Sequence, residues 1–134
     1  MNAITMSAPR LSPVELQTRR AGLGLSQNEL ADLLGTTQVV VSRWETGLAS
    51  PRDPDGVRAL LSEYESRLLA VEDRLLARAD ELQPGASVEL RVPAREEYSG
   101  TDSAQILPYA SMYRACVARV ALVLRDEGRS VTIS

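Results

Sequence analysis

The sequence of 134 residues has no histidine and a single cysteine, Cys116. Without histidine, the chain lacks the commonest metal ligand and the usual general base, and therefore a serine–histidine type of triad. One cysteine cannot form an internal disulfide or a cysteine-based zinc site. No glycine-rich phosphate loop is present. The sequence therefore predicts neither an enzyme nor a cofactor or metal site, and Cys116, in an apolar helical stretch, is expected to be a small core residue.

Lysine is absent as well, so all 15 basic residues are arginines. The formal net charge of −3 argues mildly against a nonspecific nucleic-acid binder. It leaves a sequence-specific one open, because local charge decides such binding. The planar fork of arginine suits both phosphate and guanine.

Long apolar runs are also missing. No stretch approaches the roughly 20 apolar residues that a membrane-spanning helix needs, and the N-terminal MNAITMSAPR lacks the apolar block of a secretory signal. The length suits one compact domain or two small ones. We expect a cytoplasmic protein.

Two short helices joined by a tight turn are predicted within residues 25–47. Ser26 and Glu29 form a capping box at the start of the first helix, and Gly35 ends it. Thr37 is expected to cap a second helix over Gln38–Thr46. The spacing of three apolar residues turns them inward: Val41, Trp44 and Leu48.

The opposite face of the second helix carries groups that contact bases in the major groove. Gln38 can bond adenine bidentately and Arg43 can bond guanine bidentately, while Val39 suits a thymine methyl. Ser42 lies beside them. Such a face alone is more often a solvated surface, but the preceding helix and turn favour DNA contact.

Residues 26–47 resemble the helix-turn-helix of the Cro/cI, or xenobiotic-response-element, family of regulators. The matching residues are Ser26-Gln27, Glu29-Leu30-Ala31, Leu34-Gly35 and Ser42-Arg43-Trp44-Glu45-Thr46-Gly47. The resemblance implies that Gln38, Val39 and Arg43 contact bases, next to Ser42. It also implies a set of phosphate-contacting residues: Gln27, Arg19, Arg20, Thr37 and Thr46. For Arg19 and Arg20, simple solvation is an equal alternative. Val39 and Val40 depart from the family's usual polar residues, which shifts part of the recognition toward thymine methyls and DNA shape.

The N-terminal flank is predicted to be a flexible arm, residues 1–11, followed by a first helix. Ser12 caps this helix, Pro13 is its first residue, and Glu15 completes a capping box. The helix ends near Ala21, with Val14 or Leu16 facing inward.

A long helix is predicted to open at Asp53-Pro54 and to continue for about 28 residues at helical spacing, with a possible break near Gly56 or Ser62. Its apolar stripe is too long for a helix-turn-helix domain to cover. A second copy or the C-terminal segment must cover the rest.

The C-terminal half is predicted as strand, helix and strand. Ser87–Val92 alternates as a half-buried strand does. Helical spacing returns from Ala104 or Leu107 to Glu127, with Pro108 in the first turn, and residues 129–134 form a terminal strand. Two strands and a helix are not stable alone. The strands therefore pair within one chain as a parallel pair, or exchange between subunits.

This layout is similar to the YdiL-like family, which includes anti-CRISPR-associated repressors of phages. The supporting residues are Ser42–Gly47, Ser87–Val92 and Met112–Gly128 with the tail Val131–Ile133. The resemblance implies a homodimeric autorepressor on an inverted-repeat operator. The dimerisation residues expected are Leu68, Val71, Leu75, Val88, Leu90, Met112, Cys116, Val120, Val131 and Ile133. Some relatives are thought to bind RNA, which nothing in this sequence indicates.

The sequence thus predicts a mainly α protein with three parts: the arm, a helix-turn-helix domain over residues 12–66, and a dimerisation domain over residues 67–134. The expected function is a sequence-specific regulator that binds double-stranded DNA, most simply a repressor, although an activator is also compatible. An antitoxin with the same DNA-binding half, and an adaptor that has lost DNA affinity, are the alternatives.

Overall fold

The computed structural model describes residues 10–134. The predicted arm lies outside the described residues except for Arg10 and Leu11. Leu11 is buried in the core, so the folded part begins before the predicted boundary. None of the described helices is long and apolar enough to cross a membrane.

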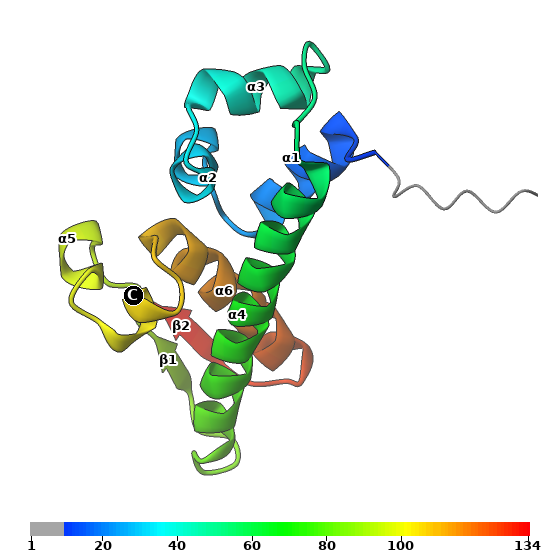
Figure 1. The fold of residues 1–134 in the computed structure, drawn as a ribbon. Coiled ribbons are helices and arrows are strands. Elements are labelled where there is room, and N and C mark those ends of the chain that lie inside the picture. The colour runs from blue at the N-terminus through cyan, green and yellow to red at the C-terminus, as the bar shows by residue number, and fades with distance from the viewer. Residues whose placement is uncertain (1–9) are drawn as a thin grey trace, which may run out of the picture.

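Four helices build the N-terminal half (Figure 1). They are α1 (Pro13–Gly22), α2 (Gln27–Leu34), α3 (Gln38–Thr46) and α4 (Pro54–Asp80). Each begins at a side chain that accepts a backbone N–H of the first turn, as the sequence predicted. These caps are Ser12, Ser26, Thr37 and Asp53. At Ser26 the full capping box with Glu29 is present.

Of the two residues predicted as alternatives to face inward from α1, Leu16 is buried and Val14 is exposed. Two other details of this half differ from the predictions. The Glu15 carboxylate pairs with Arg19, so only the Ser12 half of the predicted capping box forms. Leu48, predicted to face inward, is 80% exposed, because the left-handed Gly47 (φ 80°) ends α3 and turns the chain away from the core.

Helix α4 is a single helix of 27 residues that runs from the helix-turn-helix to the opposite end of the molecule (Figure 1). It is unbroken at Gly56 and Ser62. The predicted domain boundary at residues 66/67 falls inside it. A single cluster of buried apolar residues spans both halves.

The C-terminal half contains β1 (Val88–Leu90), α5 (Arg95–Tyr98), a 3-10 helix (η1, Asp102–Gln105), α6 (Ala110–Asp126) and β2 (Val131–Ile133). The two strands pair in parallel within one chain, with Val88 opposite Val131. This arrangement is the intrachain one of the two predicted. Helix α6 begins after Pro108 rather than around it, because the Tyr98 hydroxyl and η1 hold the preceding segment in another conformation.

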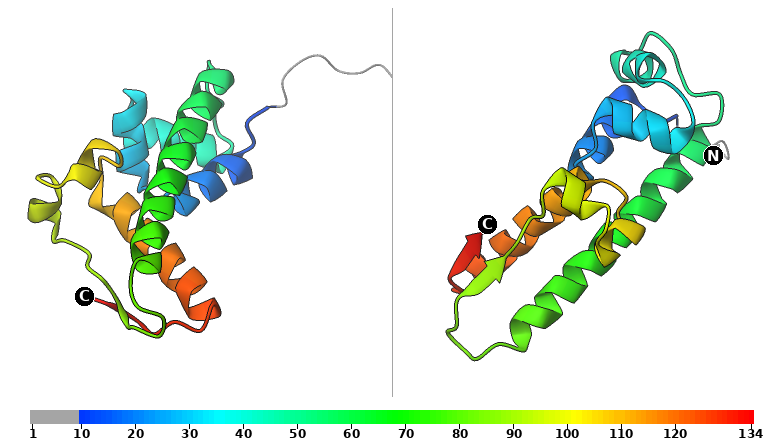
Figure 2. Two further views of the ribbon diagram at one scale, coloured as in Figure 1. Left: turned by 90° about the horizontal axis from the view of Figure 1, so that it is seen from below. Right: turned by 90° about the vertical axis from the view of Figure 1, so that its left-hand side faces the viewer.

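Helices α4 and α6 pack side by side and bury most of the predicted dimerisation residues inside one chain (Figures 1 and 2). Of the ten, only Ile133 is exposed. The other nine are core residues of the single chain: Leu68, Val71, Leu75, Val88, Leu90, Met112, Cys116, Val120 and Val131. Their apolar pattern therefore reflects packing within one chain.

The start of α6 also packs directly on the helix-turn-helix. Gly24 (φ 74°) lies so close to α6 that a Cβ there would be 2.5 Å from the carbonyl oxygen of Ser111. The Ser111 hydroxyl donates to Glu29 at 2.8 Å, and the Tyr109 hydroxyl donates to Asp32. These contacts fix the orientation of α2, and with it α3, relative to the C-terminal half.

Candidate nucleic-acid interface

Helix α3 lies at one end of the molecule with one face buried and one face open (Figure 1). Val41 is fully buried and Trp44 packs partly against the core. On the other side, Val39 is 53% exposed and Arg43 is exposed. Helical spacing brings the four predicted base-contacting residues onto neighbouring positions of this open face: Gln38, Val39, Ser42 and Arg43.

A chain of polar side chains fixes the first turns of α2 and α3 to each other. The Gln38 amide donates to the Gln27 side-chain oxygen at 2.7 Å. The Gln27 amide donates in turn to Glu45 Oε1 at 3.0 Å. Both glutamines begin their helices, so the chain sets the direction in which Gln38 presents its remaining hydrogen-bonding groups.

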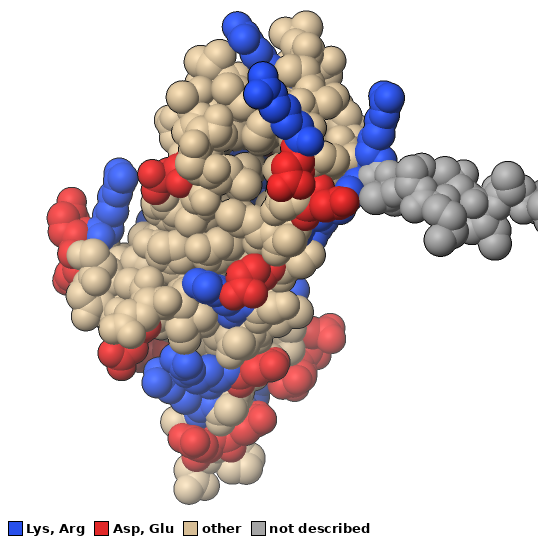
Figure 3. All heavy atoms as spheres, viewed as in Figure 1, with Lys and Arg blue, Asp and Glu red and all other residues tan. Residues whose placement is uncertain are grey.

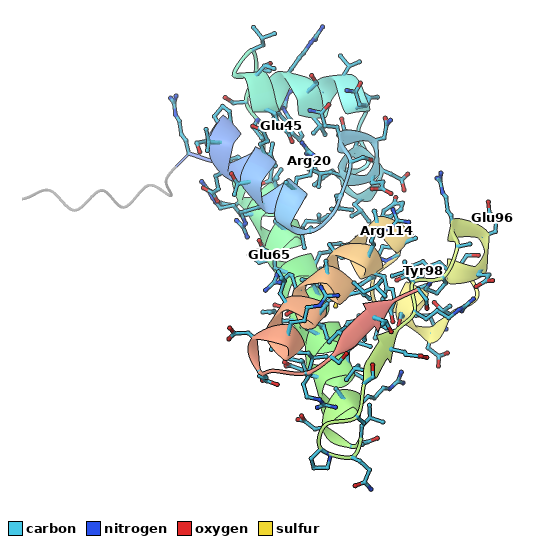
Figure 4. The ribbon with its side chains drawn as sticks, turned by 180° about the vertical axis from the view of Figure 1, so that it is seen from behind. Arg20, Glu45, Glu65, Glu96, Tyr98 and Arg114 are labelled. Atoms are coloured by element: carbon cyan, nitrogen blue, oxygen red, sulfur yellow. The ribbon has the colours of Figure 1, made fainter. Side chains whose placement is uncertain are left out.

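Arg20 anchors this chain to α1. Its Nε donates to Glu45 Oε2 at 2.6 Å and its second terminal nitrogen donates to Oε1 at 2.9 Å. The remaining nitrogen donates to the carbonyl of Leu25 at 2.8 Å. The Glu45 side chain is only 4% exposed. Figure 4 shows Arg20 and Glu45 meeting between α1 and α3.

The carboxyl of Glu45 keeps its charge in this buried position. Burial alone would raise its pKa, but the hydrogen bonds from Arg20 and Gln27 outweigh burial, and the pKa lies below its usual value. Charged donors that satisfy both oxygens account for this direction. The pair is therefore a structural tie that holds α3 against α1.

Three of the predicted phosphate-contacting residues lie at the ends of α2 and α3. Gln27 lies beside Gln38, and Thr37 caps α3, so both are at the N-terminal ends where the backbone favours anions. Thr46 lies at the other end of α3, where its hydroxyl donates to the carbonyl of Ser42 at 3.0 Å.

Arg19 and Arg20, in contrast, are already engaged with carboxylates. Arg19 donates to both oxygens of Glu65, at 2.6 and 3.0 Å, and to Glu15 at 3.1 Å. The hydrogen bond that Arg19 donates to Glu65 raises the pKa of the Arg19 guanidinium. A phosphate contact by either arginine stays a prediction, and it would have to compete with these ion pairs.

Glu45 is the residue of this site that the sequence did not assign a role. It belongs to the motif Trp44-Glu45-Thr46-Gly47, but 25 positions separate it from Arg20. No helical or strand spacing connects residues that far apart. Three further arginines between residues 10 and 55 have side chains without an ion pair or hydrogen bond among the described residues: Arg10, Arg43 and Arg52. The surface over α3 carries basic side chains and few acidic ones (Figure 3).

Residues 16–55 match the family model described as "Helix-turn-helix". The match covers under a third of the chain, namely the last turns of α1, all of α2 and α3, and the entry to α4. It supports the resemblance to Cro/cI-type regulators that the motif residues indicated. This family is one of DNA-binding regulatory domains, not of enzymes. No curated protein matches the chain.

This segment is thus a helix-turn-helix of the DNA-binding regulatory class. Among residues 10–134 there is no group of three or more acidic or cysteine side chains able to hold a metal ion. On the open face of α3 in this module, the Arg43 side chain is exposed and makes no ion pair among the described residues.

Proposed function

We propose that the protein is a sequence-specific transcriptional regulator that binds duplex DNA through the open face of α3. Arg43 and Gln38 contact base edges, Val39 contacts a thymine methyl, and Ser42 lies beside them. Gln27 and Thr37 contact the backbone phosphates on one side of the groove. The regulator acts as a repressor, because a protein seated on a promoter excludes the polymerase.

One observation carries the proposal: the polar chain Arg20–Glu45–Gln27–Gln38 adds to the apolar contacts of α3 and holds this half-exposed helix in one orientation. A helix with only a solvated surface role needs no such buried tie. A helix that contacts bases does, because hydrogen bonds to base edges require side chains held in place.

We further propose a homodimer on an inverted repeat. Two recognition helices related by a two-fold axis meet major grooves about 34 Å apart. Since nine predicted contact residues are internal, the dimer must use surfaces that one chain leaves exposed. Ile133 on β2 is 47% exposed. The carbonyl of Ser130 and the N–H of Ser134 form hydrogen bonds with β1. Because bonding residues alternate along a strand of a parallel ladder, the backbone groups of Ile133 point away from β1.

We also propose that the protein is similar to YdiL-like repressors, because it has the same order of long helix, strand, helix and strand. On this proposal the protein represses its own operon, in a phage or anti-CRISPR context. The order of elements supports this assignment.

The test is selection from a pool of random-sequence duplexes, followed by hydroxyl-radical footprinting of the enriched duplex and of the DNA upstream of the gene. We expect one enriched sequence with two-fold symmetry, protected by two chains. A pool from which nothing is enriched would overturn the proposal and favour the adaptor. An enriched, asymmetric site holding one chain would overturn the homodimer alone.

A further inference from the structure

A groove of about 550 Å³ lies where the C-terminal half meets the N-terminal end of α2. One wall comes from Ser26 and Asn28 of the helix-turn-helix, and the other from α5 and the start of α6. Arg95 and Arg114 line this second wall. The groove therefore joins residues near the candidate DNA interface to two cationic side chains that are distant in sequence.

Neither arginine has a partner within the described part of the chain. Six other arginines form ion pairs with carboxylates, and two donate to backbone carbonyls. Arg95 and Arg114 are both exposed and make no such bond. Figure 4 shows Arg114 on the first turns of α6, beneath α2.

The residues that line the groove carry more positive than negative charge, since Arg95 and Arg114 are cationic and Glu29 is the one acidic residue among them. Glu29 Oε1 accepts from the Ser26 N–H at 2.9 Å and from the Ser111 hydroxyl at 2.8 Å, which holds this carboxylate away from an ion pair with either arginine. Glu96, beside Arg95 in sequence, is exposed and makes no ion pair with it.

The first turn of α6 adds to the positive potential of the groove. Helix α6 has 17 residues, no acidic residue in its first turn and no side-chain cap at Tyr109. Unsatisfied N–H groups at such an end carry partial positive charge. Together with the two arginines, this end outweighs the single carboxylate of Glu29, which makes the groove attractive to an anion.

The position of the groove identifies the anion. Gln27, which begins α2, is bonded to Gln38 on the recognition helix, so DNA seated on α3 brings a backbone strand past the start of α2. Ser26 and Asn28 flank Gln27 and belong to the groove. We infer that Arg95 and Arg114 bind DNA phosphates just outside the segment contacted by α3. The C-terminal half thereby becomes part of the DNA-binding surface.

This inference rests on the proposed function, and a salt titration separates the two. The probe is the duplex enriched by the parent protein, and the variant is the double substitution Arg95→Ala with Arg114→Ala. The slope of log K against log salt concentration follows the number of phosphates neutralised, at about 0.9 per contact. We expect the double variant to lose about 1.8 of the slope and to lose protection of the flanking sugars in a hydroxyl-radical footprint.

The matched control is Arg74→Ala with Arg78→Ala. These two arginines are also exposed and without ion pairs, remove the same charge, and lie toward the end of α4 that is remote from α3 (Figure 1). Equal slopes for the two double variants, with specific binding intact, would overturn the inference and leave the proposed function standing. If the parent enriches no duplex, the proposed function fails first. Far-UV circular dichroism verifies that both double variants fold.

Discussion

Two glutamates with buried side chains, Glu45 in α3 and Glu72 in α4, have pKa values shifted in opposite directions although each lies beside an arginine. Glu45 receives two well-aligned hydrogen bonds from Arg20 and one from Gln27. Glu72, in the middle of α4, has Arg119 Nε 2.7 Å from its Oε1 but without the alignment of a hydrogen bond. The pKa of Glu45 is lowered, whereas burial raises that of Glu72.

The comparison separates two kinds of buried glutamate within one apolar core, which spans both halves of the molecule. In the helix-turn-helix, the Arg20–Glu45 pair and the glutamines hold α3 in addition to the apolar contacts of Val41 and Trp44. Between α4 and α6, a continuous set of apolar side chains is buried, and Glu72 is a polar group tolerated at its margin. We therefore expect loss of the charge to cost stability at Glu45 and not at Glu72.

The largest expected effect comes from removing volume between α4 and α6. Leu124 is fully buried, and Leu124→Ala should lower the free energy of unfolding by about 4 kcal/mol. Urea unfolding followed by circular dichroism measures this loss. Because the core cluster spans both halves, we expect one transition. Two separate transitions would contradict the shared core. The control is Leu122→Ala, an exposed leucine of the same helix, which should change stability by less than about 0.5 kcal/mol.

The second largest loss of stability is expected from breaking the buried Arg20–Glu45 ion pair. Glu45→Ala leaves the largely buried Arg20 guanidinium without its partner, and should lower the free energy of unfolding by about 3 kcal/mol. The comparison variant is Glu65→Ala, which removes the similarly bidentate partner of Arg19. Glu65 is 37% exposed at its side chain, so we expect a loss under about 1 kcal/mol. Equal losses in urea unfolding would show that burial does not distinguish the two pairs.

The pH dependence of stability gives a smaller effect with opposite signs at the two glutamates. The folded pKa of Glu45 is below the ordinary 4.5, so its stabilisation is present above pH 4.5 and is lost as pH falls through the folded pKa. Glu45→Gln should therefore reduce the steepness of acid destabilisation below that pH. Unfolding free energies at a series of acidic pH values check this, and unchanged steepness would contradict it.

Glu72 should show the smallest effect. Its folded pKa is above the ordinary 4.5, so its favourable contribution is present below that value and is lost as pH rises through the folded pKa. At neutral pH the charged carboxylate is a cost, and Glu72→Gln should leave the free energy of unfolding within about 1 kcal/mol of the parent or raise it. A large loss at neutral pH would show that Arg119 depends on the charge.

The same contrast explains what was predictable from the sequence. The helix-turn-helix is predictable from local signals. Ser26 with Glu29, Gly35 and Thr37 each cap a helix end that lies within a few residues of them in the sequence. The long α4 and the two strands follow from apolar spacing, whereas the pairing of the strands within one chain does not. What covers α4 does not follow either, because a stripe of apolar residues is the same whether α6 or a second chain packs on it. Nine core residues therefore have the pattern that the sequence predicts for a dimer interface.

Side-chain contacts between residues far apart in the sequence could not be predicted from the sequence either. Glu45 with Arg20, Arg19 with Glu65, and the Tyr109–Asp32 contact each join segments whose approach depends on the complete fold. Arg19 and Arg20, predicted as phosphate contacts, therefore also form ion pairs that no sequence pattern indicated. Arg95 and Arg114, which no motif singled out, gain their significance only from the groove they share.

The central claim is that the open face of α3 contacts bases. Its most direct test is the affinity of Arg43→Ala for the duplex selected by the parent protein, measured at one salt concentration beside Arg74→Ala, which removes the same charge far from α3. We expect Arg43→Ala to weaken binding by about 1–3 kcal/mol and to relax base preference at one position, while Arg74→Ala binds as the parent does. Arg43→Ala binding as tightly as the parent, with base preference unchanged, would contradict the claim.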